Sequence, residues 1–390
     1  MRLPAHYRVF AAFFLFAIAL GALLSRLPDL QKQLQLTESQ LGLMLIGMAT
    51  GSMVSLTLSG PWIDRLGARA TTLLTVIGTA LCFALVPLLP NAYVVFATLL
   101  VAGFLAGMLE INLNLEADRI EAQLGRRVMS RAHGFWSLGF FVTALLGAGA
   151  RQAAIEPYLH TGSICLAVVV LSIPLFWAMT TAPKRDHTEP AGPRIALPNI
   201  GLLPLCIIAC AAFLIEGTGI DWSVIYMRDV FDVSNFIDGL SLTLFTGVMA
   251  IGRLFTDPIV DRYGPRAVAV FLLSVAAAGS LLIGLVIHPY ISLLGFALIG
   301  LGCSSVYPLA VSAAAQRTDR PSSVNVAALA QVSFVVFFLG PPLLGFVAEH
   351  FGIRFSYLFV LPIIVAGLVL SGALEPRKSS PTVKQAEADG

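Results

Sequence analysis

The chain has 390 residues, of which 57% are hydrophobic and 12% are charged, and its formal net charge is +2. Soluble domains usually carry about a quarter charged residues. Half that share, with a mean hydropathy of +0.86, excludes a water-exposed surface for most of the chain. The small net charge gives no reason to expect a nucleic-acid partner. We therefore expect a lipid bilayer to surround the chain.

Twelve apolar stretches are long enough to cross a bilayer as helices, which takes about 20 residues each. The seventh stretch is the hardest to place, because Glu216 and Asp221 interrupt it. The pattern predicts an all-α fold with twelve transmembrane helices. The stretches begin near Arg8, Gln40, Ala70, Ala92, His133, Thr161, Ile200, Ile237, Ala267, Pro289, Val324 and Phe355.

The basic residues indicate the orientation of the chain. With both termini in the cytoplasm, all but five of the 24 Lys and Arg residues fall in cytoplasmic segments. Cytoplasmic loops of membrane proteins carry such an excess. This assignment places Arg253 with Arg262 and Arg266 in one cytoplasmic segment. The five exceptions are Arg26, Lys32, Arg151, Arg228 and Arg354.

A polar motif occurs once in each half of the chain. Gly60–Arg69 closes the second stretch and Asp257–Arg266 closes the eighth, and both contain Asp-Arg-x-Gly-x-Arg. An internal repeat indicates two related structural units. We therefore expect two pseudo-symmetric six-helix bundles. The expected boundaries are 1–182 for the first bundle, 183–198 for a cytoplasmic linker, 199–376 for the second bundle and 377–390 for a disordered cytoplasmic tail.

These motifs resemble those of the major facilitator superfamily over essentially the whole chain. The two Asp-Arg-x-Gly-x-Arg loops carry the likeness, together with Gly340–Gly345 in the eleventh stretch. Asn114–Ala117, His133-Gly134 and Asp221–Ser223 are similar to poorly characterised bacterial inner-membrane permeases near the fucose–proton symporters.

The resemblance implies a bacterial inner-membrane protein whose two bundles rock around a central cavity lined by helices 1, 4, 7 and 10. It also implies that Asp64 and Arg65 latch the cytoplasmic side of the outward-open state. In fucose symporters an acidic residue followed by asparagine on helix 4 serves proton coupling and sugar binding. Glu110, with Asn112 and Asn114, lies where those residues would be.

Acidic residues inside the predicted spans are candidates for function, because a charge at bilayer depth is costly and usually faces a cavity or a partner. On the fourth span Gly103, Gly107, Glu110 and Asn114 share one helix face. The glycines are expected to allow close packing with a neighbouring helix. Polar residues follow Glu116 at once, so we expect Glu116 to lie at the lipid headgroups.

The seventh span carries Glu216 and Asp221 with Gly217 and Gly219 between them. Glycines between carboxylates predict a loosened or broken helix that exposes its backbone to the solute. Arg26, at the outer end of the first span, is expected to bridge to Asp221 or Glu216 as an outer gate. The alternative is an ordinary interfacial arginine that reaches water.

The candidate residues fall into three groups. The aromatic candidates can stack on a solute. An interfacial belt explains Trp222 equally well. His133 can instead be a structural cap. The proton-coupling candidates are Glu110 and Glu216; the substrate-binding candidates are Asn112, Asn114, Asp221, Trp222, Tyr307, Gln331, His133 and Trp136; the gating candidates are Arg26, Asp64, Arg65, Arg69, Asp261, Arg262 and Arg266.

The sequence predicts a secondary transporter that takes up a small polar organic solute, sugar-like or a related metabolite, together with protons. There is no phosphate-binding Gly-x-x-x-x-Gly-Lys loop and no metal-spaced histidine pair, so we expect no enzymatic activity, cofactor or metal. One chain contains both bundles, so we expect a monomer. The alternatives are a proton-driven exporter of an amphiphilic metabolite, drug or siderophore, and a membrane solute sensor without turnover. The fifth span lacks the Gly-Pro element of many drug exporters, which favours uptake.

Overall fold

The computed structural model describes residues 3–125, 128–183 and 196–375, and these ranges contain helices and no strands. The helices of these ranges make twelve spans that are long and apolar enough to cross a membrane, as the sequence predicts. Most of the expected linker, residues 184–195, and the expected tail, 377–390, lie outside the described residues.

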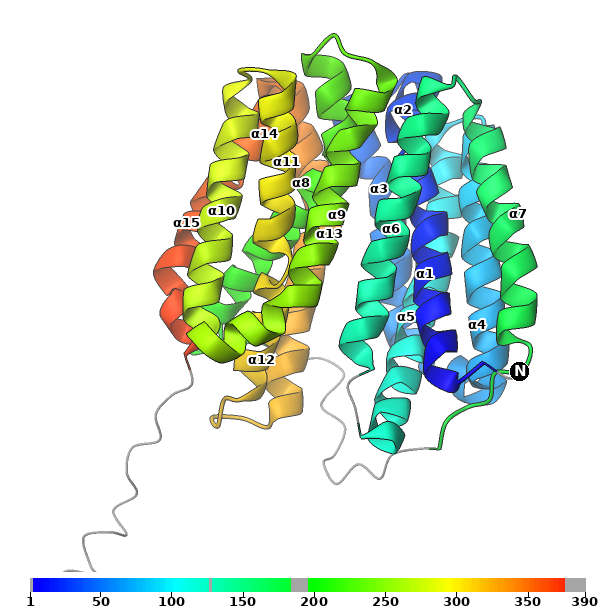
Figure 1. Ribbon diagram of the computed structural model, residues 1–390, viewed down its shortest axis with the longest axis vertical. Coiled ribbons are helices and arrows are strands. Elements are labelled where there is room, and N and C mark those ends of the chain that lie inside the picture. The colour runs from blue at the N-terminus through cyan, green and yellow to red at the C-terminus, as the bar shows by residue number, and fades with distance from the viewer. Residues whose placement is uncertain (1–2, 126–127, 184–195, 376–390) are drawn as a thin grey trace, which may run out of the picture.

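The helices form two bundles that lie side by side (Figure 1). The first contains α1 (Ala5–Leu24), α2 (Leu27–Leu34), α3 (Glu38–Leu58), α4 (Gly60–Leu85), η1 (Val86–Leu88), α5 (Ala92–Leu124), α6 (Met129–Gln152) and α7 (Pro157–Phe176). The second contains α8 (Leu203–Val230), α9 (Asn235–Tyr263), α10 (Pro265–Leu285), α11 (Pro289–Cys303), α12 (Val306–Ala315), α13 (Ser322–Phe351), α14 (Ile353–Phe359), α15 (Leu361–Val369) and η2 (Leu370–Leu374).

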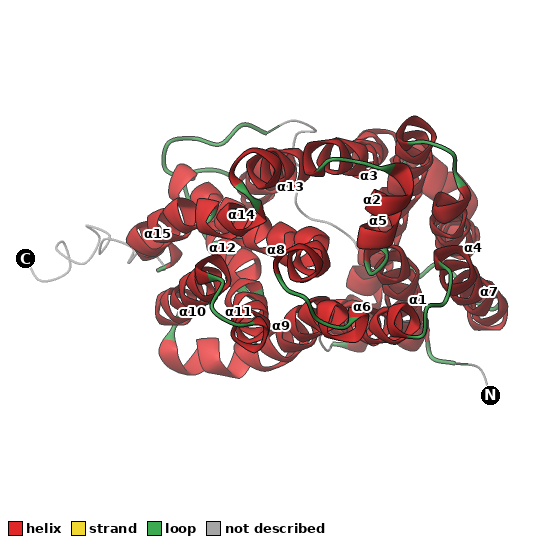
Figure 2. Cartoon of the chain, turned by 90° about the horizontal axis from the view of Figure 1, so that it is seen from above, coloured by secondary structure: helices red, strands yellow, loops and turns green. Residues whose placement is uncertain are grey.

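Two seams join the bundles: α3 faces α13 on one side, and α6 faces α9 on the other (Figure 2). We call the end of the molecule where α1 begins the proximal end, and the opposite end the distal end. Figure 1 shows the bundles converging at the distal end and diverging towards the proximal end.

Glycines allow the helices to approach closely, as the sequence predicts for the fourth span. A Cβ atom on Gly103 of α5 would lie 2.0 Å from the carbonyl oxygen of Met48 on α3. Glycines also allow close contact at the two seams between the bundles. A Cβ on Gly42 would lie 2.5 Å from the carbonyl oxygen of Pro341, and one on Gly239 would lie 2.5 Å from the Cβ of Ala148.

The repeated motif adopts the same backbone turn in both halves. Gly67 has φ 72° and Gly264 has φ 83°, a region that only glycine enters without strain. This turn explains the glycine of Asp-Arg-x-Gly-x-Arg. It also explains an error in the predicted boundaries: α4 begins at Gly60 and not near Ala70, because the motif is itself helical on both sides of Gly67.

Candidate transport site

Arg151 on α6 connects the two bundles at the distal end. Its Nε lies 3.4 Å from Oδ1 of Asp29 in the first bundle, and its Nη1 lies 3.7 Å from Oδ2 of Asp238 in the second. The same Nη1 also donates to the carbonyl of Asn235 at 3.5 Å. The side chains of Arg151 and Asp238 are both nearly inaccessible to solvent.

A second arginine reinforces the same end. Arg228 on α8 donates to the carbonyl oxygen of Pro28 at 2.9 Å and to Oε1 of Gln31 at 2.7 Å, both in α2. Glu349 on α13 accepts from the backbone N–H of Ser39 at 3.1 Å. These contacts hold the distal end shut. We call Asp29, Arg151, Arg228 and Asp238 the distal clasp.

The predicted bridge from Arg26 to Asp221 or Glu216 is wrong. Arg26 pairs with Asp29 at 3.0 Å, and it donates to Nδ1 of His160 at 3.2 Å and to the carbonyl of Ile155 at 2.9 Å. All three partners belong to the first bundle. The chain turns into α2 directly after Arg26, which brings Asp29 within one helical turn. Burial lowers the pKa of the Arg26 guanidinium, and Asp29 supplies the counter-charge.

An arginine and a glutamate meet between the bundles, near the middle of their helices. Arg253 Nη2 on α9 lies 3.3 Å from Oε1 and 3.5 Å from Oε2 of Glu216 on α8. Nη1 of Arg253 donates to Oγ of Ser137 on α6, in the other bundle, at 3.2 Å. The two charged side chains are 22% and 21% exposed. We call Arg253, Glu216 and Ser137 the central cluster.

Arg253 is a residue that the sequence reasoning missed, because it was counted as cytoplasmic. It lies about 15 Å from the end of α9, ten residues at 1.5 Å each. One signal points to it: α9 continues past Arg253 to Tyr263, so Arg253 lies inside a helix long enough to cross the bilayer, whereas Arg262 lies in its last turn.

The predicted helix break is also in the wrong span. α8 is continuous through Gly217 and Gly219, and a Cβ on Gly219 would lie 2.3 Å from the ring of Phe245. This glycine serves close packing.

The interruption occurs instead between α11 and α12, in the tenth membrane span. The carbonyl of Ser304 at that interruption accepts from Nε of Arg253 at 3.2 Å. Four residues later stands Pro308, which has no N–H to satisfy that carbonyl within a helix. The broken span therefore gives Arg253 one of its acceptors.

Glu110 on α5 faces the space between the bundles. Its side chain is exposed, although it lies about 21 Å from the proximal end of α5 at 1.5 Å per residue. Tyr307, on α12 in the other bundle, lies near Glu110. Tyr307 itself packs edge-on against Phe213 at 4.8 Å. Among the described residues Glu110 has no hydrogen bond or ion pair.

Two aromatic candidates adjoin the central cluster. The ring of Trp136 lies 5.8 Å from the Arg253 guanidinium. His133, one turn away on α6, packs at 4.9 Å against Phe13 and lies near Arg253. Both side chains are half-buried.

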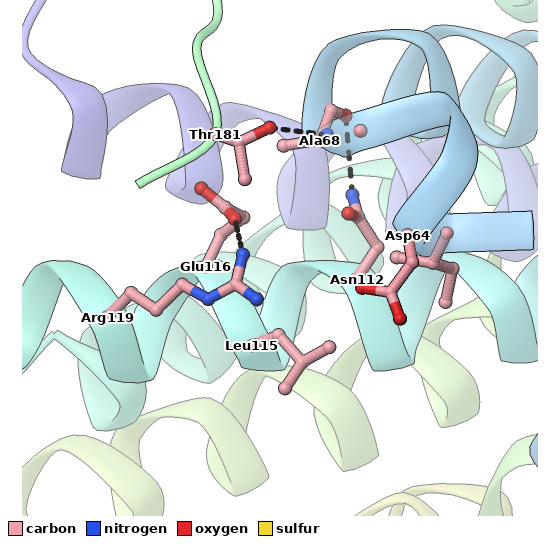
Figure 3. Close-up of a pocket in the computed structure, with 9 residues that line it drawn as sticks. Asp64, Ala68, Asn112, Leu115, Glu116, Arg119 and Thr181 are labelled. Carbon is pink, nitrogen blue, oxygen red and sulfur yellow. Dashed lines mark hydrogen bonds and ion pairs between the residues drawn. The ribbon is translucent and has the colours of Figure 1, made fainter. Parts of the chain in front are cut away.

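Other substrate-binding candidates face away from this space. Asn112 is 2% exposed and donates to Oγ1 of Thr72 on α4 at 2.9 Å (Figure 3). Trp222 is fully buried and packs against Gly345. Gln331 accepts from the backbone N–H of Ala196 at 3.0 Å. These three side chains are engaged in packing or in bonds to the protein. Asn114 and Asp221 are half-buried.

Glu116 is enclosed by the protein, and its expected position at the lipid headgroups stays a prediction. Its side chain is 1% exposed and lies 2.7 Å from Nη1 of Arg119, and its other oxygen accepts from the N–H of Ala182 at 2.9 Å. The helix α5 continues to Leu124, two turns past Glu116. Glu116 borders a cavity of about 150 Å³ that Asp64 and Thr181 also line (Figure 3).

The gating candidates of the repeated motif lie at the proximal end. The second arginine of each copy contacts the end of its own bundle: the guanidinium of Arg69 lies 4.1 Å from the Trp177 ring, and Arg266 pairs with Glu375 at 3.0 Å. The gating role remains a prediction. The other motif candidates are exposed: Asp64, Arg65, Asp261 and Arg262.

The sequence profile of the Major Facilitator Superfamily matches residues 9–234 and 205–390, so each half matches separately. The chain belongs to the Major Facilitator Superfamily. An uncharacterised transporter of Sinorhizobium fredii is 30% identical over 352 residues, which are 90% of this chain and 93% of the relative. The predicted family resemblance is therefore confirmed, and the chain is a multi-pass membrane transporter of this superfamily.

Solved structures agree with the fold. A bacterial homologue of the human lysosomal transporter Spinster, in an inward-facing and unoccupied conformation, superposes with a TM-score of 0.74 at 12% identity and covers 97% of this chain and 98% of its own. The Escherichia coli fucose–proton symporter has a TM-score of 0.64 at 16% identity, with 95% and 98% covered. At these identities the likeness establishes the superfamily fold alone.

Proposed function

We propose that this superfamily member is a proton-coupled transporter that takes up a small polar organic solute by alternating access. The distribution of basic residues puts the distal end in the periplasm and both termini in the cytoplasm of a bacterial inner membrane. With the distal clasp closed, the central cluster is reached by water from the cytoplasmic side. The clasp breaks and reforms in each transport cycle.

The observation that carries the proposal is the position of the Arg253–Glu216 pair. It lies between the bundles, contacts both of them through Ser137, and is one-fifth exposed. Charges at this depth are costly unless they serve a pathway. Protonation of Glu110 removes a negative charge that has no ion pair among the described residues, which lowers the cost of closing the bundles around it; Glu216 would be protonated only when another group takes its place on Arg253.

Two other functions use parts of the same structure. A proton-driven exporter would use the same acids in reverse. The absence of proline among the glycines of α6 favours uptake. A solute sensor without turnover would need no acid facing the space between the bundles, and Glu110 is such an acid.

The test uses purified protein in proteoliposomes. A thermal-shift screen against sugars, cyclitols, organic acids and siderophores first identifies a stabilising solute, since a bound ligand stabilises the fold. Glu110→Gln should then abolish accumulation of that solute driven by a pH gradient while leaving counterflow largely intact. Glu156→Gln, at the exposed start of α7, is the matched control and should change neither. Equal loss of accumulation and counterflow in Glu110→Gln would contradict the coupling role.

A further inference from the structure

The contacts of Arg253 in the central cluster are long. Its four contacts to Ser137, Ser304 and both oxygens of Glu216 measure 3.2 to 3.5 Å. Charge-assisted N–H···O bonds usually measure about 2.7–2.9 Å. By comparison, Arg119 lies 2.7 Å from Glu116. The guanidinium of Arg253 therefore has acceptors but no tight partner.

The surroundings of Arg253 are suited to receive a ligand. The side chain is 22% exposed, and its acceptors come from both bundles, so a ligand bound there would touch both. A guanidinium presents a planar fork of donors that matches a carboxylate. The half-buried Trp136 ring, on the facing helix α6, supplies an apolar face for the remainder of such a ligand.

We propose that Arg253 binds a carboxylate of the solute, that the solute is a small organic anion, and that Glu216 is the group it displaces. This inference rests on the proposed function and names its substrate class. When the solute carboxylate takes the place of Glu216 on Arg253, the Glu216 carboxylate accepts one proton from the water of the pathway. The cluster keeps one positive and one negative charge throughout. A monoanion is therefore carried with one proton and no net charge.

The groups that face Glu216 favour this exchange. Arg253 on α9 is its counter-charge, Asp221 lies on the same helix, and Cys303 comes from α11. His133 on α6 lies near Arg253. Once Arg253 turns to the solute, the Glu216 carboxylate loses its counter-charge inside the protein, which favours its neutral form.

The experiment compares carboxylates with their own amides. The full chain in detergent is titrated, by thermal shift and by Trp fluorescence, with lactate and lactamide, gluconate and gluconamide, glucuronate and glucuronamide, and benzoate and benzamide. At least one carboxylate should stabilise the protein while its amide does not. Arg253→Lys should weaken that binding about tenfold, because a single ammonium replaces the fork. Arg253→Gln should abolish it, and Arg131→Gln, an exposed arginine on α6, should leave it unchanged.

Glu216→Gln gives a result of the opposite sign. Glutamine competes weakly for the guanidinium and takes up no proton, so this variant should bind the carboxylate several-fold more tightly and with little pH dependence. It also covers the case in which Arg253→Gln fails to fold. The inference is overturned if no carboxylate in the panel is preferred to its amide, if Arg253→Gln retains the preference, or if Glu216→Gln binds more weakly.

Failure of the anion site can be distinguished from failure of the proposed transport function. Proton-driven accumulation of a neutral solute that survives in Arg253→Gln would overturn the anion site and leave the transporter intact. Carboxylate binding at Arg253 without proton-driven accumulation would support the anion site and overturn proton-coupled transport.

Discussion

The arginine–glutamate pair on α5 and the pair between α8 and α9 both lie on membrane helices, and they differ in almost every respect. Arg119 and Glu116 lie one turn apart on α5 at 2.7 Å, with the Glu116 side chain 1% exposed. Arg253 and Glu216 come from two helices, lie 3.3 Å apart and are each about one-fifth exposed. The first pair also holds the backbone of Ala182, whereas the second reaches into the other bundle. The two pairs are thus distinguished by their geometry, their exposure and their contacts across the bundles, and on these grounds we expect the second pair to act in transport.

The largest effect should come from breaking the central pair. Arg253→Gln should lower the initial rate of counterflow about 100-fold, equivalent to about 2.8 kcal/mol, because it removes the charge that both bundles share. The measurement is solute exchange in proteoliposomes per folded molecule. A rate within a few-fold of the wild type would show that counterflow does not depend on this pair.

Breaking the α5 pair should act on stability instead. Glu116→Ala leaves the Arg119 guanidinium and the Ala182 N–H without their acceptor, and loss of one partner of a buried pair costs about 3–5 kcal/mol. Arg119 is partly exposed, so we expect the lower end of that range, measured by thermal melting in detergent. Transport per folded molecule should stay within about twofold of the wild type. A transport defect without loss of stability would contradict a purely structural role for the Arg119–Glu116 pair.

An ion pair in a loop gives the smallest effect. Arg317 lies 2.8 Å from Asp319 between α12 and α13. Hydrogen bonds from Arg317 and Asn199 hold the pKa of Asp319 well below its usual range. Its stabilisation is present above the unfolded pKa of about 4 and fades as the pH falls through the folded pKa. Asp319→Asn should lower the melting temperature slightly at pH 7, and the difference should shrink below about pH 4. A difference that grows on acidification would contradict this assignment.

The architecture was predictable because lipid imposes a simple pattern: twelve apolar stretches and a repeated Asp-Arg-x-Gly-x-Arg loop were sufficient for twelve spans in two bundles. Glu110 and Glu216 were found in the same way, as acids in apolar stretches.

The partners of these residues were not predictable. Arg26 lies on the same side as Asp221, but the local turn into α2 gives it Asp29 instead. Arg253 joins Ser137 across 116 residues of sequence, and its acceptor at Ser304 depends on a proline in another helix. Such contacts depend on how the two bundles pack against each other, and local sequence patterns do not predict that packing.

The most direct test of the account is a pair of distances between spin labels in a variant without the five native cysteines. One pair reports the distal end, at Tyr93 and Tyr290, and the other the proximal end, at Leu124 and Gln316, all exposed positions. Arg151→Gln with Arg228→Gln breaks the distal clasp. If the bundles rock around the central cluster, the distal distance should lengthen and the proximal distance should shorten in the same sample. A longer distal distance with an unchanged proximal one would show local fraying and contradict alternating access.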